Sequence, residues 1–199
     1  AGSFIGILGK TGSGKTTLAN ILAKFYEIPT GKIFFNDIDI NDIERKSFYE
    51  KFAYVMQDDY IYDNTIKHNI ELYKNYEKNE VKEATKKAEL FDTIEKLDKK
   101  YDTLIGDNGI KLSGGQKQRL ILSRNLITNP NILIIDNGFT GLDIDTRKKV
   151  IDNLNNRNNK ATLVIISSMM EDIKNADKIY KLENKTLVEI NMEEEVYDA

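Results

Sequence analysis

Residues 4–17 have the sequence FIGILGKTGSGKTT, in which a mostly apolar run leads into a loop rich in glycine. The apolar run, residues 4–8, predicts a buried strand. The next residues match the pattern G-x-x-x-x-G-K-[ST], where glycines allow backbone N–H groups to close around phosphate oxygens. In this pattern Lys15 reaches the β and γ phosphates and the Thr16 hydroxyl ligates Mg²⁺. The stretch therefore predicts a strand, a phosphate-binding loop and the start of a helix.

The residues after this loop predict a helix whose N-terminus faces the phosphates. Leu18, Ile21, Leu22 and Phe25 recur at helical spacing, so we expect them to form its buried face. The helix dipole would then favour a bound anion. The loop residues expected to bind the nucleotide are Gly9, Lys10, Thr11, Gly12, Ser13, Gly14, Lys15, Thr16 and Thr17.

The composition restricts the class of protein. A chain of 199 residues suits one domain with a substantial core. The net charge of −3 provides no overall basic field, so we expect no nucleic-acid partner. The absence of cysteine excludes a disulfide framework, a thiolate metal site and a cysteine nucleophile. The longest apolar runs, such as residues 132–135, have the length of a strand and fall far short of a membrane helix.

A second glycine-rich segment, Leu112 to Gln116, precedes a predicted helix over residues 117–128. Its sequence LSGGQ would place backbone N–H groups and a serine hydroxyl at a helix N-terminus, where a phosphate can bind. A plain helix cap is the alternative. The two glycines favour a ligand that approaches the backbone closely, because a cap needs one serine and gains nothing from Gly-Gly.

Three further strands end in polar residues. Residues 131–135 predict a buried strand that ends at Asp136, a carboxylate well placed to hold Mg²⁺ through water. The apolar strand over residues 52–58 contains Gln57, which alone would be an ordinary strand-end amide. Residues 161–166 predict another buried strand, ending at Ser168. We also expect a hairpin over residues 178–190 and an acidic helix end at residues 193–195.

Residues 65–101 are rich in Lys and Glu with spaced apolar positions, which predicts a small helical subdomain. The charged residues there predict a solvated face. His68, the one histidine, has no partner motif around it and is expected to be non-catalytic.

In this order and spacing the motifs resemble the nucleotide-binding domain of ATP-binding cassette (ABC) proteins, over nearly the whole chain. Residues 9–16 match Walker A, Gln57 the Q-loop, residues 112–116 the LSGGQ signature, residues 132–136 Walker B and residues 141–143 the D-loop. The resemblance implies an α/β fold. This fold is a P-loop NTPase core with a mainly parallel sheet flanked by helices, with a helical subdomain over residues 65–130 that bears the signature.

The resemblance extends to exporters through residues 57–66, 69–70 and 103–109, and the last of these segments would face the transmembrane coupling helices. Family knowledge then implies a head-to-tail dimer at the cytoplasmic face of the cell membrane. ATP and Mg²⁺ would lie between Walker A of one domain and Ser113, Gly114, Gly115 and Gln116 of the other. Thr16, Gln57 and Asp136 would hold the metal. The residues expected to act in catalysis are Lys15, Gln57, Asp136, Asn137 and Ser168.

Two of these residues depart from the family pattern. Asn137 stands where the family usually has a glutamate, and Ser168 stands where its switch histidine is expected. A carboxamide can orient water but cannot accept its proton, and loss of a general base costs on the order of 10²–10⁴ in rate. We therefore expect a domain that binds Mg-ATP but hydrolyses it weakly, and whose intact signature completes the site of a non-identical partner domain.

The start of the chain is a third departure. Family members carry an adenine-stacking aromatic residue ahead of Walker A, and the chain begins too late to include it, so we expect truncated N-terminal strands, weaker ATP affinity and lower stability. Three alternatives stay open. They are a module in which ATP merely gates binding or regulation, a non-transport ABC ATPase and an importer. The second is disfavoured by the lack of a basic face, and the third by the exporter-like segment.

Overall fold

The computed structural model describes residues 2–156 and 161–191, which form parts of two compact units. The described part of the first unit comprises residues 2–54, 130–137 and 161–191, and that of the second comprises residues 55–129 and 138–156. The expected acidic helix end at residues 193–195 lies outside the described residues. The helical subdomain expected over residues 65–130 overlaps the second unit. Among the described residues, no helix combines the length and the apolarity that crossing a bilayer requires.

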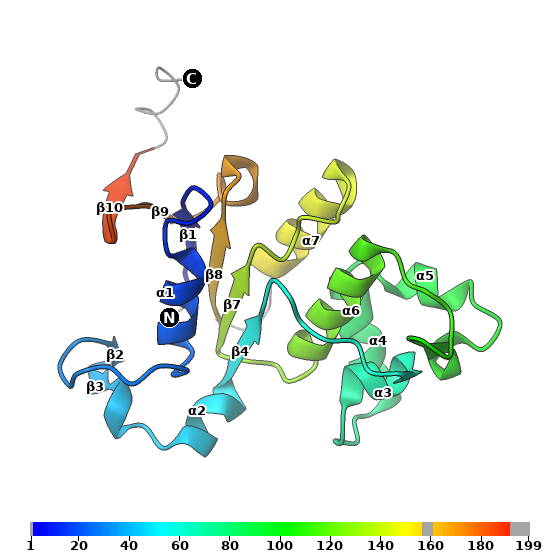
Figure 1. The fold of residues 1–199 in the computed structure, drawn as a ribbon. Helices are drawn as coiled ribbons and strands as arrows, with labels where there is room; N and C mark the ends of the chain where they lie inside the picture. The colour runs from blue at the N-terminus through cyan, green and yellow to red at the C-terminus, as the bar shows by residue number, and fades with distance from the viewer. Residues whose placement is uncertain (1, 157–160, 192–199) are drawn as a thin grey trace. The chain divides into compact units, whose positions relative to one another are not determined.

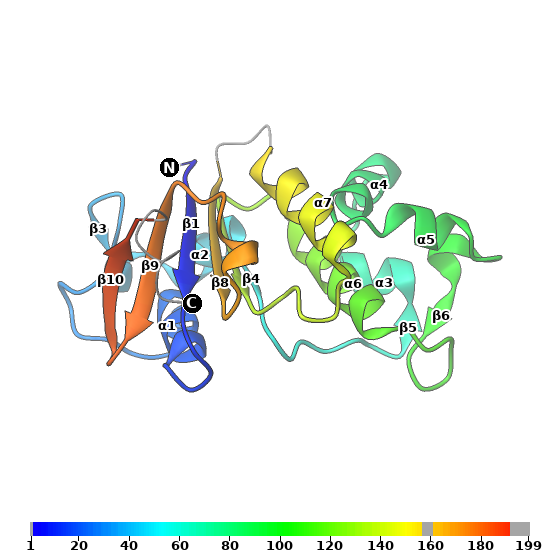
Figure 2. The ribbon, with the colours of Figure 1, turned by 90° about the horizontal axis from the view of Figure 1, so that it is seen from above.

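A six-stranded sheet organises the first unit, with the order β10-β9-β1-β8-β7-β4 (Figures 1 and 2). Strand β1 pairs in parallel with β8 and β9, and β7 pairs in parallel with β8, whereas β10 is antiparallel to β9. The strands are β1 (Phe4–Leu8), β4 (Phe52–Val55), β7 (Ile132–Asp136), β8 (Thr162–Ser167), β9 (Lys178–Glu183) and β10 (Thr186–Ile190). The prediction of a mainly parallel sheet is confirmed. Because β1, β7 and β8 run in one direction, the residues that follow them meet at one edge.

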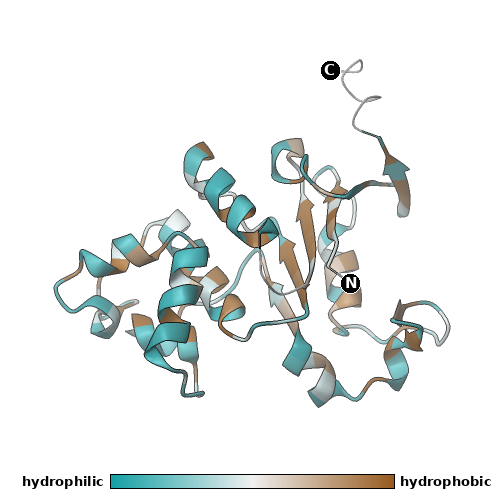
Figure 3. Cartoon of the chain, turned by 180° about the vertical axis from the view of Figure 1, so that it is seen from behind, coloured by the Kyte–Doolittle hydropathy of each residue, from teal (hydrophilic) through white to brown (hydrophobic). Residues whose placement is uncertain are grey.

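Apolar side chains hold this sheet to its helices. The central strands are the most hydrophobic part of the ribbon in Figure 3. One buried cluster joins Ile7 and Ile134 of the sheet to Ala19 and Phe48 of the helices. The helical and short strand elements of this unit are α1 (Lys15–Leu22), β2 (Phe34–Phe35), β3 (Ile38–Asp39), η1 (Ile40–Asp42), α2 (Arg45–Lys51) and η3 (Met170–Asp172). Burial of such a cluster contributes about 25 cal/mol per Å² of apolar surface removed from water.

The end of α1 differs from the prediction. The helix stops at Leu22, Lys24 has a left-handed backbone (φ 58°), and Phe25 is 51% exposed. The expectation that Phe25 lies on the buried face is therefore wrong. The physical reason is that a residue beyond a left-handed turn no longer follows the 3.6-residue period of the helix.

The second unit is mainly helical. Its elements are β5 (Asn64–Thr65), α3 (Ile66–Glu71), α4 (Lys78–Lys87), α5 (Phe91–Glu95), η2 (Lys100–Asp102), β6 (Leu104–Ile105), α6 (Gly114–Leu126) and α7 (Ile144–Asn155). Helix α6 packs against α3 and α4, and its Leu120 is fully buried. The expected helices over residues 65–101 are confirmed, with their charged side chains mostly exposed. His68 packs edge-on against Tyr73, with the ring centroids 5.5 Å apart.

Candidate functional site

The phosphate loop joins β1 to α1 in the first unit. Gly12 (φ 82°) and Gly14 (φ 99°) have positive φ, which residues with a Cβ rarely adopt, and Gly14 is the N-cap of α1. The Ser13 hydroxyl is buried and has no hydrogen-bond partner within the described chain. A buried polar atom without a partner is costly. A phosphate oxygen bound in the loop would satisfy it.

Lys15 is the first residue of α1 and its side chain curls back over the loop. The ammonium donates hydrogen bonds to Gly9 O (2.7 Å) and Lys10 O (2.9 Å). The residue is 6% exposed. Burial lowers the pKa of Lys15, and the negative charge of Asp136 opposes this shift. A buried cation held by two carbonyls is prepared to exchange them for phosphate oxygens, which carry full negative charge.

Thr16 and Asp136 meet at the carboxyl edge of the sheet. Asp136 is the last residue of β7 and is fully buried, and Thr16 Oγ1 donates to its Oδ2 at 2.6 Å. Burial raises the pKa of Asp136, and the hydrogen bond from Thr16 and the charge of Lys15 oppose the rise. A hydroxyl and a carboxylate are the hard oxygen donors that Mg²⁺ prefers. These two residues therefore fit a magnesium ion.

Asn137 and Ser168 follow β7 and β8, so both lie at this same edge of the first unit. The Asn137 amide Nδ2 donates to Asp136 Oδ1 at 3.4 Å, and its backbone N donates to Ile166 O at 2.9 Å. Ser168 is exposed, whereas the hydroxyl of the preceding Ser167 donates to Asp172 Oδ2 at 2.5 Å. The sheet thus gathers Lys15, Thr16, Asp136 and Asn137 around the loop, with Ser168 after the neighbouring strand.

Gln57 and the signature segment belong to the second unit. Gln57 is exposed and follows β4, which ends at Val55 rather than at residue 58 as expected. The role of Gln57 as a magnesium ligand stays a prediction.

The signature segment forms the N-terminus of α6, as expected, although the helix begins at Gly114 rather than at residue 117. Ser113 and Gln116 form a capping box, in which Ser113 Oγ accepts from Gln116 N (3.3 Å) and Gln116 Oε1 accepts from Ser113 N (2.9 Å). The cap and the two glycines are thus both present. Lack of space requires a glycine at position 115, because a Cβ there would lie 2.5 Å from Gly141 O. A Cβ on Gly114 would meet nothing within 4 Å, which leaves that backbone open to a ligand.

The two exporter-like segments contact each other. Strand β5 pairs with β6 through Asn64 and Ile105, and Asn108 N donates to Asp63 Oδ1 at 3.1 Å. Arg124, which no sequence motif singles out, supports this region from α6. Its guanidinium donates to Asn69 O (2.7 Å) and to Tyr60 O (2.8 Å). The sequence signal for this role is an arginine at an apolar, buried position of a helix, where a charged side chain needs partners.

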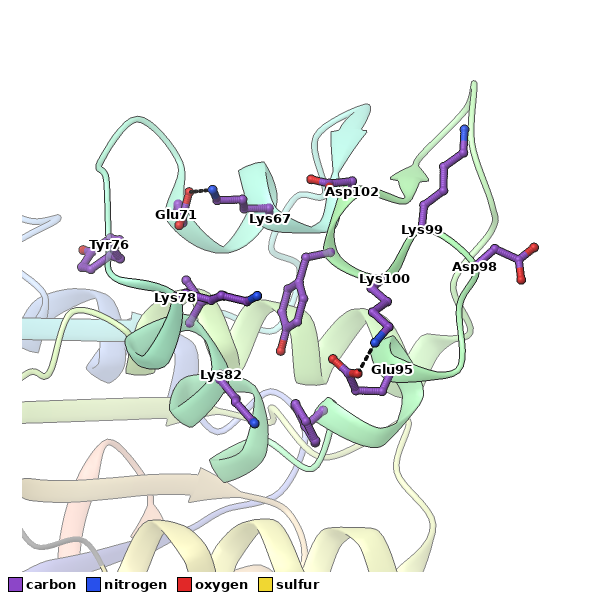
Figure 4. Close-up of a pocket in the computed structure, with 13 residues that line it drawn as sticks. Lys67, Glu71, Tyr76, Lys78, Lys82, Glu95, Asp98, Lys99, Lys100 and Asp102 are labelled. Atoms are coloured by element: carbon purple, nitrogen blue, oxygen red, sulfur yellow. Dashed lines mark hydrogen bonds and ion pairs between the residues drawn. The ribbon is translucent and has the colours of Figure 1, made fainter.

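Two cavities differ in their relation to these residues. One of about 600 Å³ adjoins the phosphate loop and is lined by Gly12, Thr17 and Lys185 among others, a size that suits a small ligand. The other, of about 860 Å³, lies in the second unit between ion pairs of Lys67 with Glu71 (4.0 Å) and of Lys100 with Glu95 (2.7 Å), as Figure 4 shows. None of the candidate residues lines the second cavity.

Tyr54 and Asn20 also lie near this site, and no sequence motif singles them out. Tyr54 lies on β4 with 9% exposure, and its hydroxyl donates to Asn20 Oδ1 on α1 at 3.1 Å. Burial, followed by the charge of Asp136, raises the pKa of Tyr54, so the phenol stays protonated. The sequence signal for Tyr54 is a phenol within an otherwise apolar strand, because a buried hydroxyl needs a hydrogen-bond partner.

The chain resembles known proteins along most of its length. Residues 1–140 match the family model described as ABC transporter. The beta-(1→2)glucan export ATP-binding/permease protein NdvA of Bartonella bacilliformis is 40% identical over 190 residues, which cover 95% of this chain and 32% of that protein. The ATP-dependent lipid A-core flippase of Haemophilus influenzae is 35% identical over 202 residues, covering 96% of this chain and 34% of the flippase. The chain thus spans about a third of the length of these relatives.

A solved structure has the same fold. The structure of a bacterial Atm1-family ABC exporter with ATP bound superposes with a TM-score of 0.87 at 33% identity. The match covers 94% of this chain and 33% of that protein.

Proposed function

The chain belongs to the ABC transporter family, a family of P-loop ATPases, and from that premise we propose that it is the nucleotide-binding domain of an exporter. Nucleotide-driven dimerisation of such domains would energise transport by transmembrane domains, with this domain at the cytoplasmic face of the cell membrane. The export functions in the names of two relatives support this proposal. The single observation that carries it is the meeting of Lys15, Thr16 and Asp136 around one phosphate loop.

The residues of the first unit divide the work of binding Mg-ATP. Backbone N–H groups of residues 9–17 and the Ser13 hydroxyl would bind phosphate oxygens, and Lys15 would neutralise their charge. Thr16 would ligate Mg²⁺ directly, and Asp136 would hold it through water. When bound, the metal neutralises charge on the transferred phosphoryl group. Gln57 stays a predicted further ligand of the metal.

The proposal includes weak hydrolysis at this domain's own site. Asn137 is beside Asp136, where a residue that accepts a proton from water would act, but a carboxamide has no proton-accepting capacity at neutral pH. Ser168 carries a short neutral hydroxyl where an imidazole would reach the γ-phosphate. Both losses fall in the first unit, on the same sheet edge as the phosphate loop.

The intact signature would serve a different domain. Ser113, Gly114, Gly115 and Gln116 would close over ATP held by a non-identical partner with a complete hydrolytic site. The open space beside the Gly114 Cα supports this role, since a phosphate could approach the helix N-terminus there. The same low turnover would suit a module that only gates dimerisation with ATP, which is the second candidate function.

Turnover of the full-length homodimer tests the weak-hydrolysis part of the proposal. We expect the double variant Asn137→Glu/Ser168→His to hydrolyse ATP about 10²–10⁴ times faster than the unmodified protein, because it regains a general base. Adding Lys15→Ala to the double variant is the control and should abolish the gain. If the unmodified protein already turns over near the rate of the double variant, its site is not degenerate. ATP binding with no turnover in either protein would favour the gating module.

A further inference from the structure

One glutamine of the signature helix α6 holds the loop that precedes α7. Gln118 Oε1 accepts a hydrogen bond from Gly141 N at 2.8 Å, and Gln118 Nε2 donates to Thr140 Oγ1 at 2.9 Å. The two contacts use both ends of the side-chain amide, so together they fix its orientation. All three residues belong to the second unit.

The same loop lies against the backbone of the signature segment. A Cβ on Gly141 would lie 3.0 Å from Gly115 N and 3.1 Å from the carbonyl carbon of Gly114. Gly114 and Gly115 form the N-terminus of α6, where backbone N–H groups suit a phosphate. Residues 140 and 141 therefore border the surface that the signature would present to a nucleotide.

This surface is accessible to water in the chain alone. Thr140 and Gly141 are exposed, and Gln118 is half-buried. Because water competes for hydrogen bonds at such positions, the two contacts add only modestly to stability. A partner domain that covers the surface would exclude this water, and in the lower local dielectric the same hydrogen bonds would hold the loop more firmly.

We propose that Gln118 is a positioning residue that ties residues 140 and 141 to the signature helix, so that the loop and the signature close over a partner's nucleotide as one wall. This inference rests on the proposed function, because it concerns how the signature acts on ATP held by another domain. Without the glutamine amide the signature would still meet that ATP, but the loop would no longer be tied to it at this point.

The first experiment measures how firmly the loop is held in the isolated chain. Gln118→Met removes both hydrogen bonds, keeps a side chain of similar length and introduces another good helix former. Without nucleotide, we expect hydrogen exchange of the Gly141 amide, followed by NMR, to become about fivefold faster in this variant.

Asn125→Leu is the matched control. Asn125 Nδ2 donates to Ile121 O within α6 at 2.9 Å, so this variant also removes a side-chain hydrogen bond of the helix without touching the loop. It should leave the exchange of Gly141 unchanged. Circular dichroism melts of all variants check that they fold.

The second experiment measures closure over a nucleotide. The test chain carries Lys15→Ala, so that it holds no ATP of its own, and it is mixed with excess ¹⁵N-labelled wild-type chain and Mg-ATP. Mass spectrometry then distinguishes the peptides of the two chains. With the labelled chain at about ten times its dissociation constant, exchange in the test chain should slow about tenfold at residues 113–116 and 138–142 together.

Adding Gln118→Met to the test chain should separate the two segments. We expect the protection of residues 113–116 to stay within about twofold and the protection of residues 138–142 to be lost. A merely structural role of the glutamine would lower the Tm and leave the two segments protected together.

The inference is overturned if Gln118→Met leaves the exchange of Gly141 unchanged, or if residues 138–142 are protected equally with and without the glutamine. Protection of residues 113–116 alone when Gln118 is present would also overturn it, and would leave the proposed function standing. Protection of neither segment would instead contradict the shared nucleotide site of the proposed function, so the two failures are distinguishable.

Discussion

At the scale of single residues, Asn137 combines a side chain that cannot act as a general base with a backbone conformation that suits asparagine better than glutamate. Its backbone is left-handed, with φ 49°, and its backbone N donates to Ile166 O on the neighbouring strand, which holds this conformation. Asparagine tolerates the left-handed region better than residues with longer side chains do. Asparagine at position 137 therefore leaves the site without a general base and also fits the backbone at the end of β7.

We therefore predict that Asn137→Glu lowers stability even if it restores hydrolysis. A glutamate forced into this conformation would cost about 1 kcal/mol, which corresponds to a fall in Tm of about 2–4 °C for a chain of this size. A thermal melt in the absence of nucleotide measures this shift. Asn137→Gly is the matched variant, because it lacks the Cβ that causes the strain, and it should melt above Asn137→Glu. Equal Tm values for Asn137→Glu and the wild type would show that this backbone imposes no such cost.

At the scale of elements, the two glycines that begin α6 have different reasons to be there. Gly115 faces Gly141 and Leu142 of the loop before α7, where a Cβ would lie 2.5 Å from Gly141 O and 3.2 Å from Leu142 Cδ2. Gly114 faces open space. Sequence alone predicts that the pair is one ligand-binding feature, whereas the structure explains Gly115 by packing within the second unit.

The corresponding alanine variants should separate folding from function. Gly115→Ala should destabilise the chain by about 1–3 kcal/mol, because the loop has to move to make room. Gly114→Ala should leave the Tm unchanged or raise it, because alanine favours the helix by about 0.5–1 kcal/mol, yet it should impair ATP turnover of an assembled transporter. Melting curves and ATPase rates measure the two effects. A Gly114→Ala transporter with full activity would argue against a phosphate at this helix N-terminus.

The elements also show how far a sequence determines such a fold. Strands β9 and β10 form the hairpin expected over residues 178–190, because polar turn residues delimit an alternating pattern. The end of α1 and the start of α6 were misjudged. In the first case Phe25 continues the apolar spacing past a left-handed turn, and in the second the helix begins within glycines, which have low helix propensity.

The residues of the candidate site likewise divide into those that the sequence identifies and those that it does not. Lys15, Thr16 and Asp136 could be named from sequence because each belongs to a local pattern of glycines or of a strand followed by a carboxylate. Tyr54 could not, because the effect of the Asp136 charge on its phenol depends on β4 lying next to β7, and no local pattern encodes the order of strands in a sheet.

At the scale of the whole molecule, the candidate residues are divided between the two units. The phosphate loop, Asp136, Asn137 and Ser168 belong to the first, and Gln57 and the signature segment belong to the second. Under the proposed head-to-tail arrangement, the first unit of one domain and the signature of another share one nucleotide.

This division predicts an asymmetric response to nucleotide. In the dilute isolated chain, Mg-ATP should slow hydrogen exchange at residues 9–17, whose N–H groups would bind phosphate, and leave residues 113–116 unchanged. Adding a complete partner domain should then slow exchange at residues 113–116 as well, because their N–H groups would gain phosphate oxygens held by the partner. Exchange measured by mass spectrometry resolves both segments.

Removing the metal and removing the lysine provide the controls for that experiment. EDTA should weaken the protection of residues 9–17, since Thr16 and Asp136 would lose the ion that they hold, and Lys15→Ala should abolish it. Lys15→Ala should not affect residues 113–116 when they close over ATP held by a partner that keeps its own lysine and metal. Protection of residues 113–116 by Mg-ATP in the dilute isolated chain would contradict the shared site, because one chain would then contain both walls around its nucleotide.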